Sequence, residues 1–228
     1  GYIYDEKNVI YKNENILNYF ENISTEEEFR NAISNANGIF SVIIQKDKKI
    51  MFSVDKTRTF PLLYIDNEND LIISDDSYFL RENYKNDLDN VNSDEFLSIG
   101  FVMGEETLLQ NIFQVQAGEF LISDGNRLKK EFYFDYLTKK TFIKSFDELK
   151  SKFLDILRDS IQRIIKLANG RQIVLPLSGG YDSRIIASLL KQANYQNVTC
   201  FTYGKKSSSE VVTSQKVANE LGFKWFFV

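Results

Sequence analysis

The residue types best suited to chemistry stand together in one short stretch, Ser178-Gly179-Gly180-Tyr181-Asp182-Ser183. The apolar run at residues 173–175 predicts a buried strand before it, and residues 184–192 predict a helix after it. A strand that turns through two glycines into a helix makes an anion site, because the helix start presents unpaired N–H groups and a partial positive charge. The two serines add hydroxyl donors, and Asp182 suits a Mg²⁺ ion held by phosphates.

This stretch lacks the spaced glycines and the terminal Gly-Lys-Ser/Thr of a Walker loop. It resembles the SGGxDS pyrophosphate loop (PP-loop) of ATP-pyrophosphatases, and among them the synthetase domain of the asparagine synthetase family. That resemblance implies ATP and Mg²⁺ as cofactors and a small carboxylate as substrate. Such enzymes adenylate the carboxylate, release pyrophosphate and form an amide when an amine attacks the acyl-adenylate, as in asparagine biosynthesis. The alternative for the stretch alone is a serine- and glycine-rich turn without a ligand.

The resemblance also implies roles for individual residues. Cys200-Phe-Thr-Tyr-Gly204 is similar to the family's second strand, whose end contacts adenine. The residues expected to hold ATP or pyrophosphate are therefore Leu177, Ser178, Gly179, Gly180, Asp182, Ser183, Tyr203 and Gly204. Of these, Asp182 is the expected metal ligand, and Leu177 and Tyr203 are expected to flank the adenosine. No catalytic residue is assigned.

Two domains are expected to position these residues. Helix and strand patterns alternate over residues 145–228, which predicts a parallel α/β sheet with right-handed crossovers. The resemblance identifies this part as the N-terminal portion of a Rossmann-like, adenine-nucleotide α-hydrolase-like domain. Consecutive hairpin patterns over residues 1–137 predict an antiparallel α+β domain instead, and residues 138–144 are a plausible linker.

The N-terminal domain resembles an Ntn-type glutamine amidotransferase domain through several weak motifs in the right order. These are Gly38-Ile-Phe-Ser-Val-Ile43, Asp55 with Phe60-Pro-Leu-Leu-Tyr64, and Ala117-Gly118-Glu119. The family's glutaminase uses an N-terminal cysteine, whereas the first residue here is Gly1. The only cysteine, Cys200, falls in a predicted buried strand and is expected to be a core residue. We therefore expect a degenerate domain without glutamine hydrolysis.

The apolar stretch at residues 223–228 predicts a strand with an unpaired edge. The family's second loop, Ser-Gly-x-Gly-x-Asp-Glu, does not occur in the sequence. We therefore expect a truncated synthetase domain, completed through this strand by the rest of a longer chain or by a homo-oligomer. Residues 1–228 alone are expected to bind nucleotide weakly and to turn over little or not at all.

Composition narrows the classes of partner. The net charge of −4 gives no reason to expect nucleic acid or an anionic membrane, and no apolar run approaches the roughly 20 residues that span a bilayer. Histidine is absent, which excludes His-based triads and His metal ligands. A single cysteine fits a reducing, cytoplasmic setting.

The sequence thus predicts an asparagine-synthetase-like, ATP-dependent, AMP-forming amide ligase without glutaminase activity. The alternative is a non-catalytic interaction or scaffold protein that retains the fold but has lost the reaction. An ATP-pyrophosphatase that inserts sulfur or nitrogen into tRNA would need a basic surface, which the net charge of −4 disfavours.

Overall fold

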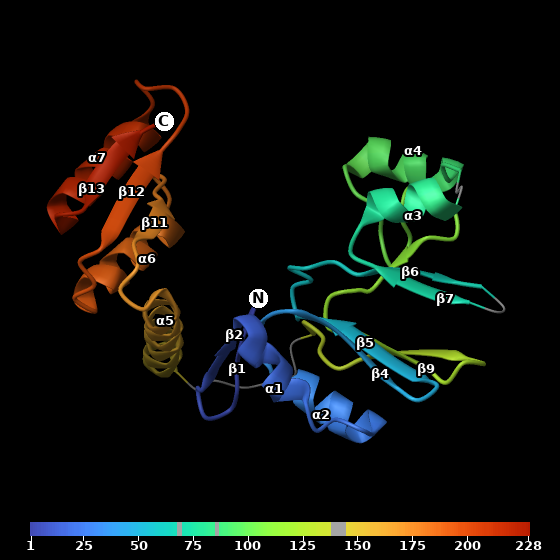
Figure 1. Ribbon diagram of the computed structural model, residues 1–228. Coiled ribbons are helices and arrows are strands. Elements are labelled where there is room, and N and C mark those ends of the chain that lie inside the picture. Colours follow the sequence, from blue (N-terminus) through green and yellow to red (C-terminus); the bar gives the residue numbers. More distant parts are fainter. Residues whose placement is uncertain (68–69, 85–86, 138–144) are drawn as a thin grey trace. The chain divides into compact units, whose positions relative to one another are not determined.

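The computed structural model describes residues 1–67, 70–84, 87–137 and 145–228. The chain forms two compact units, Gly1–Thr138 and Lys139–Val228 (Figure 1). The expected linker, residues 138–144, lies outside the described residues. The whole is a mixed α/β protein with several sheets.

The described residues of the first unit form three sheets whose neighbouring strands are all antiparallel. A small sheet has the order β2-β1-β3, with β1 (Tyr2–Tyr4), β2 (Ile10–Lys12) and β3 (Asn37–Ile39). A central sheet has the order β10-β9-β5-β4, with β4 (Ser41–Lys46), β5 (Lys49–Val54), β9 (Glu119–Ser123) and β10 (Leu128–Phe132). A third has the order β7-β6-β8, with β6 (Leu63–Asp66), β7 (Leu71–Ser74) and β8 (Phe113–Gln114). The helical segments are η1 (Asn13–Asn15), α1 (Ile16–Phe20), α2 (Glu26–Asn35), α3 (Ser77–Tyr84) and α4 (Asn90–Ile99). The hairpins predicted from the sequence are confirmed.

The first unit has four layers. Both faces of its sheets carry core side chains, because successive residues of a strand point to opposite faces. On β5, Met51 joins the core cluster under α1 and α2, whereas Phe52 joins the cluster between the central sheet and the sheet β7-β6-β8. On β6, Tyr64 belongs to that middle cluster, whereas Ile65 packs with Leu80 of α3. The order is therefore helices, sheet, sheet, helices (Figure 1).

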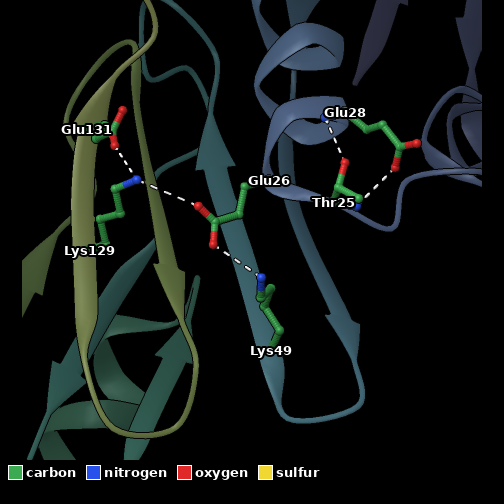
Figure 2. Close-up of polar contacts among 6 residues, drawn as sticks. All are labelled: Thr25, Glu26, Glu28, Lys49, Lys129 and Glu131. Carbon is green, nitrogen blue, oxygen red and sulfur yellow. Dashed lines mark hydrogen bonds and ion pairs between the residues drawn. The ribbon is translucent and has the colours of Figure 1, made fainter.

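The first turn of α2 forms hydrogen bonds with its N-cap residue and ion pairs with the central sheet (Figure 2). The stretch Ser24-Thr25-Glu26-Glu27-Glu28 predicts a capping box, and the structure confirms it, with Thr25 and Glu28 each accepting from the backbone N–H of the other. The Glu26 carboxylate lies 3.1 Å from the Lys49 ammonium of β5 and 3.6 Å from that of Lys129 of β10. These ion pairs are exposed to solvent and contribute little to stability. The fully buried Phe29 and Ile33 are what hold α2 to the sheet.

Two expected boundaries in this unit were wrong. The apolar pattern of residues 39–45 predicts a single strand, but the strand is broken at Phe40, whose N–H donates to the Asp55 carboxylate and whose C=O accepts the Asp55 N–H. The pattern Ser93-Asp94-Glu95-Phe96-Leu97 predicts a helix that begins at Ser93, but α4 begins at Asn90, because the Asp89 carboxylate accepts the N–H of Asn92 and caps the helix earlier.

The second unit has one parallel sheet in the order β11-β12-β13, as the sequence predicted. Its elements are α5 (Phe146–Ala168), β11 (Ile173–Pro176), α6 (Tyr181–Gln192), β12 (Val198–Thr202), α7 (Ser209–Leu221) and β13 (Lys224–Phe227). Leu175, Cys200 and Trp225 lie side by side across the sheet and belong to one core with residues of α5, α6 and α7. Among the described residues, no helix has the length and apolar composition needed to cross a membrane.

Cys200 is a core residue, as expected, and its side chain has no exposed surface. Burial raises the pKa of its thiol from 9.0 to about 11. Because the thiolate is the reactive form, we expect iodoacetamide at pH 8 to label the folded chain at least about 100-fold more slowly than the urea-unfolded chain. Mass spectrometry after timed quenching measures both rates, and equal rates would contradict this burial.

Candidate functional site

The stretch Ser178–Ser183 lies where β11 is followed by α6, at the carboxyl end of the parallel strands. The helix begins at Tyr181, three residues earlier than the sequence predicted. Asp182 and Ser183 therefore belong to the first helical turn rather than to the loop before it. Asp182 is exposed to solvent, and among the described residues no group of three or more Cys, Asp or Glu side chains could hold a metal by itself.

The two serines of this loop contact each other. Their hydroxyl oxygens are 2.9 Å apart, and the Ser183 hydroxyl also accepts the N–H of Ser178 at 3.1 Å. The N–H of Gly180 donates to the Ser178 hydroxyl at 3.2 Å. These bonds connect the loop to the first turn of α6 and place the two hydroxyls next to each other at the start of the helix.

The start of α6 has no side-chain cap. Its N-cap residue is Gly180, which provides no acceptor for the first N–H groups of the helix. The described helices α2, α4, α5 and α7 instead have Thr25, Asp89, Ser145 and Ser208 as N-cap residues, and each of these side chains accepts a backbone N–H. The donors at the start of α6 are therefore available to an anion.

Gly179 lies directly against the start of α7. A Cβ atom at this position would be 3.0 Å from the Glu210 Cα atom and 3.3 Å from its Cγ atom. Because the nearest of these atoms belongs to backbone, the absence of a side chain is what lets the loop approach α7. The sequence alone gave no sign that Glu210 and Gly179 are neighbours.

We expect Gly179→Ala to destabilise the second unit by about 1–3 kcal/mol, because overpacking must displace the first turn of α7. Gly180→Ala is the matched control, since a Cβ there would meet only the Ser178 hydroxyl, at 3.3 Å. Urea unfolding followed by fluorescence of Trp225, the only tryptophan, compares the two variants. Equal midpoints would contradict the predicted clash.

The ends of β11 and β12 are tied together, which brings the remaining predicted residues to the same edge of the sheet. The Thr202 hydroxyl donates to the Leu177 carbonyl at 2.6 Å, and the Leu177 N–H donates to the Phe201 carbonyl at 2.8 Å. Leu177 is only 1% exposed, so in this structure its side chain has almost no accessible surface with which to make the expected contact with adenosine. Tyr203 is 73% exposed, and Gly204 follows it with a φ of +123° that favours glycine.

One pair of side chains in the first turn of α6 was not singled out from the sequence. The Arg184 guanidinium carbon lies 4.5 Å from the centroid of the Tyr181 ring, and Arg184 Nε donates to the Gly180 carbonyl at 3.0 Å. Residues three apart on a helix are neighbours, so this spacing was the signal that could have revealed the pair.

Comparisons with known proteins bear mainly on the second unit. A search of curated proteins finds no match. One similar solved structure is the glutamine phosphoribosylpyrophosphate amidotransferase from B. subtilis complexed with ADP and GMP. It is 12% identical, with a TM-score of 0.34, and the match covers 94% of this chain but only 63% of that chain. A TM-score this low does not establish a shared fold. The family model described as asparagine synthase matches residues 152–228, which include β11, the loop Ser178–Ser183, α6 and both later strands.

Proposed function

We propose that the second unit binds Mg·ATP at the loop Ser178–Ser183 and belongs to an ATP-dependent, AMP-forming carbon–nitrogen ligase. The observation that carries this proposal is the opening of a glycine loop into an uncapped helix, within the segment that matches the asparagine synthase model. An uncapped helix start favours oxygens of phosphate because its N–H groups and dipole both attract negative charge.

Each residue of the loop would have a distinct task. Gly179 and Gly180 let phosphate oxygens approach the backbone, and the hydroxyls of Ser178 and Ser183 donate to them. Their mutual bond of 2.9 Å keeps the two hydroxyls in place before the nucleotide arrives. Asp182 would supply one carboxylate oxygen to Mg²⁺, whose remaining ligands would be phosphate and water oxygens. Bound Mg²⁺ would neutralise part of the charge on the phosphates.

The reaction proposed for the whole protein has two steps. A carboxylate oxygen of the substrate attacks the α-phosphorus, the bond from that phosphorus to the bridging oxygen breaks, and pyrophosphate leaves. An amine nitrogen then attacks the acyl carbon, AMP leaves, and the nitrogen loses a proton. In the first step, the backbone N–H groups and hydroxyls of the loop would stabilise the negative charge that gathers on the leaving pyrophosphate.

For the first unit we propose an amidotransferase-like fold without glutamine hydrolysis. Its four layers of helices, sheet, sheet and helices support the fold assignment. The only thiol in residues 1–228 is Cys200, which lies in the core of the other unit with a raised pKa. These residues therefore offer no nucleophilic thiol to a glutamine substrate.

Isothermal titration calorimetry of residues 1–228 with ATP tests the nucleotide site. We expect saturable binding in the presence of Mg²⁺ and much weaker binding with excess EDTA. A parallel thermal scan should show that Mg·ATP raises the unfolding temperature of the second unit, since a ligand of the folded state stabilises it. Absence of both effects at millimolar Mg·ATP would overturn the proposal.

A further inference from the structure

Arg184 lies in the first turn of α6, and its side chain points back toward the start of the helix. Its Nε–H donates back to the Gly180 carbonyl, four residues earlier, so the guanidinium lies at the beginning of α6 rather than further along it. The same group lies over the Tyr181 ring, at 4.5 Å from its centroid. Two contacts therefore hold the guanidinium beside the loop Ser178–Ser183.

This position is electrostatically unfavourable without a negatively charged neighbour. The start of a helix carries partial positive charge, so a cation is stabilising at the other end. Within the described residues, no carboxylate forms an ion pair with Arg184, although Asp182 lies in the same turn. Stacking on Tyr181 compensates only in part, because such contacts are weak at exposed sites. Tyr181 itself is 79% exposed.

The chemistry of the guanidinium fits the missing negative charge. Arginine has five N–H donors, of which the bond to Gly180 uses only the one on Nε. Its two Nη groups can form the forked, bidentate contact that arginine makes with phosphate. Neither Nη group forms a hydrogen bond within the described residues, so their donors are available to a ligand.

We propose that Tyr181 and Arg184 form an anion clamp that grips the outer phosphates of the nucleotide and the pyrophosphate that leaves. In this arrangement Tyr181 positions the guanidinium, and Arg184 contacts the phosphate oxygens. The inference rests on the proposed nucleotide function, and it assigns to this pair the discrimination between a triphosphate and a monophosphate.

Calorimetric titrations with Mg·ATP, Mg·pyrophosphate and AMP test the clamp in residues 1–228. We expect Arg184→Ala to weaken Mg·ATP and Mg·pyrophosphate about 10- to 100-fold, as for loss of a hydrogen bond to a charged group. AMP affinity should stay within about twofold of wild type, because AMP lacks the outer phosphates that Arg184 would contact. Arg184→Lys should restore binding only in part, since an ammonium lacks the planar fork. Tyr181→Phe should match wild type, and Tyr181→Ala should fall between wild type and Arg184→Ala.

Lys216→Ala, which removes one positive charge from the exposed side of α7, is the matched control and should leave all three affinities unchanged. Wild-type protein that does not bind Mg·ATP would overturn the nucleotide function and the clamp together. Wild-type protein that binds, with an Arg184→Ala variant that binds equally well, would overturn the clamp alone. Loss of AMP affinity equal to the loss for Mg·ATP would show that the arginine merely supports the structure, which also overturns the clamp.

Discussion

Asp182→Ala should weaken Mg·ATP binding by roughly 30-fold or more while leaving metal-free ATP binding almost unchanged. The physical reason is that the carboxylate acts on the metal, and truncating one partner of a close charge pair typically costs about 2–5 kcal/mol. Asp182 is exposed and lies in the first turn of α6, so its removal should not disturb the fold. Titrations in Mg²⁺ and in EDTA, compared between variant and wild type, give the metal-dependent part directly.

Asp159→Ala provides the matched control for this experiment. Asp159 is an exposed carboxylate on α5 of the same unit, and its loss changes the net charge by the same amount. It should leave both titrations unchanged. If Asp182→Ala bound Mg·ATP as tightly as this control, Asp182 could not be the metal ligand, and the loop would have no carboxylate for Mg²⁺.

Asp55→Ala should destabilise the first unit by about 3 kcal/mol or more. Asp55 has no exposed surface, and its carboxylate accepts the backbone N–H groups of Phe40, Thr57 and Thr59 at 3.3, 2.8 and 3.0 Å. It also accepts the hydroxyls of both threonines. The alanine variant would lose all of these charge-assisted bonds, each worth about 1.5–3 kcal/mol, and would leave the N–H of the buried Phe40 without an acceptor. Asp55→Asn should also destabilise, because its amide nitrogen would meet N–H donors.

The two units report separately on this change. Trp225 lies in the second unit, so its fluorescence in urea follows that unit, whereas hydrogen exchange at Phe40, Thr57 and Thr59 follows the first. We expect faster exchange at these three amides in Asp55→Ala. The matched control is Asp94→Ala, an exposed aspartate on α4, which should not change the exchange. Exchange rates equal to those of the control would show that Asp55 is not needed to hold β3 to β5.

Local pattern was sufficient wherever a single property of the chain determines the structure. The hairpins of the first unit follow from strand-like runs separated by polar turns, and α5 follows from its apolar spacing between Ser145 and Asn169. Pattern was insufficient where two signals competed. Phe40 lies within an apolar run, yet both its N–H and its C=O form hydrogen bonds with Asp55, fifteen residues away. These bonds divide the run into β3 and β4.

The sequence by itself determined the order of elements, the antiparallel first unit and the parallel strands of the second, and it singled out the stretch Ser178–Ser183 as the candidate site. These follow from residue type and spacing, which act over a few neighbouring positions. Only the tertiary structure decided that Gly179 is pressed against Glu210, that Leu177 is buried beneath the loop, and that Arg184 folds back over Tyr181. Contacts of this kind depend on how helices pack on a sheet, and packing joins residues whose separation along the chain carries no periodic signal.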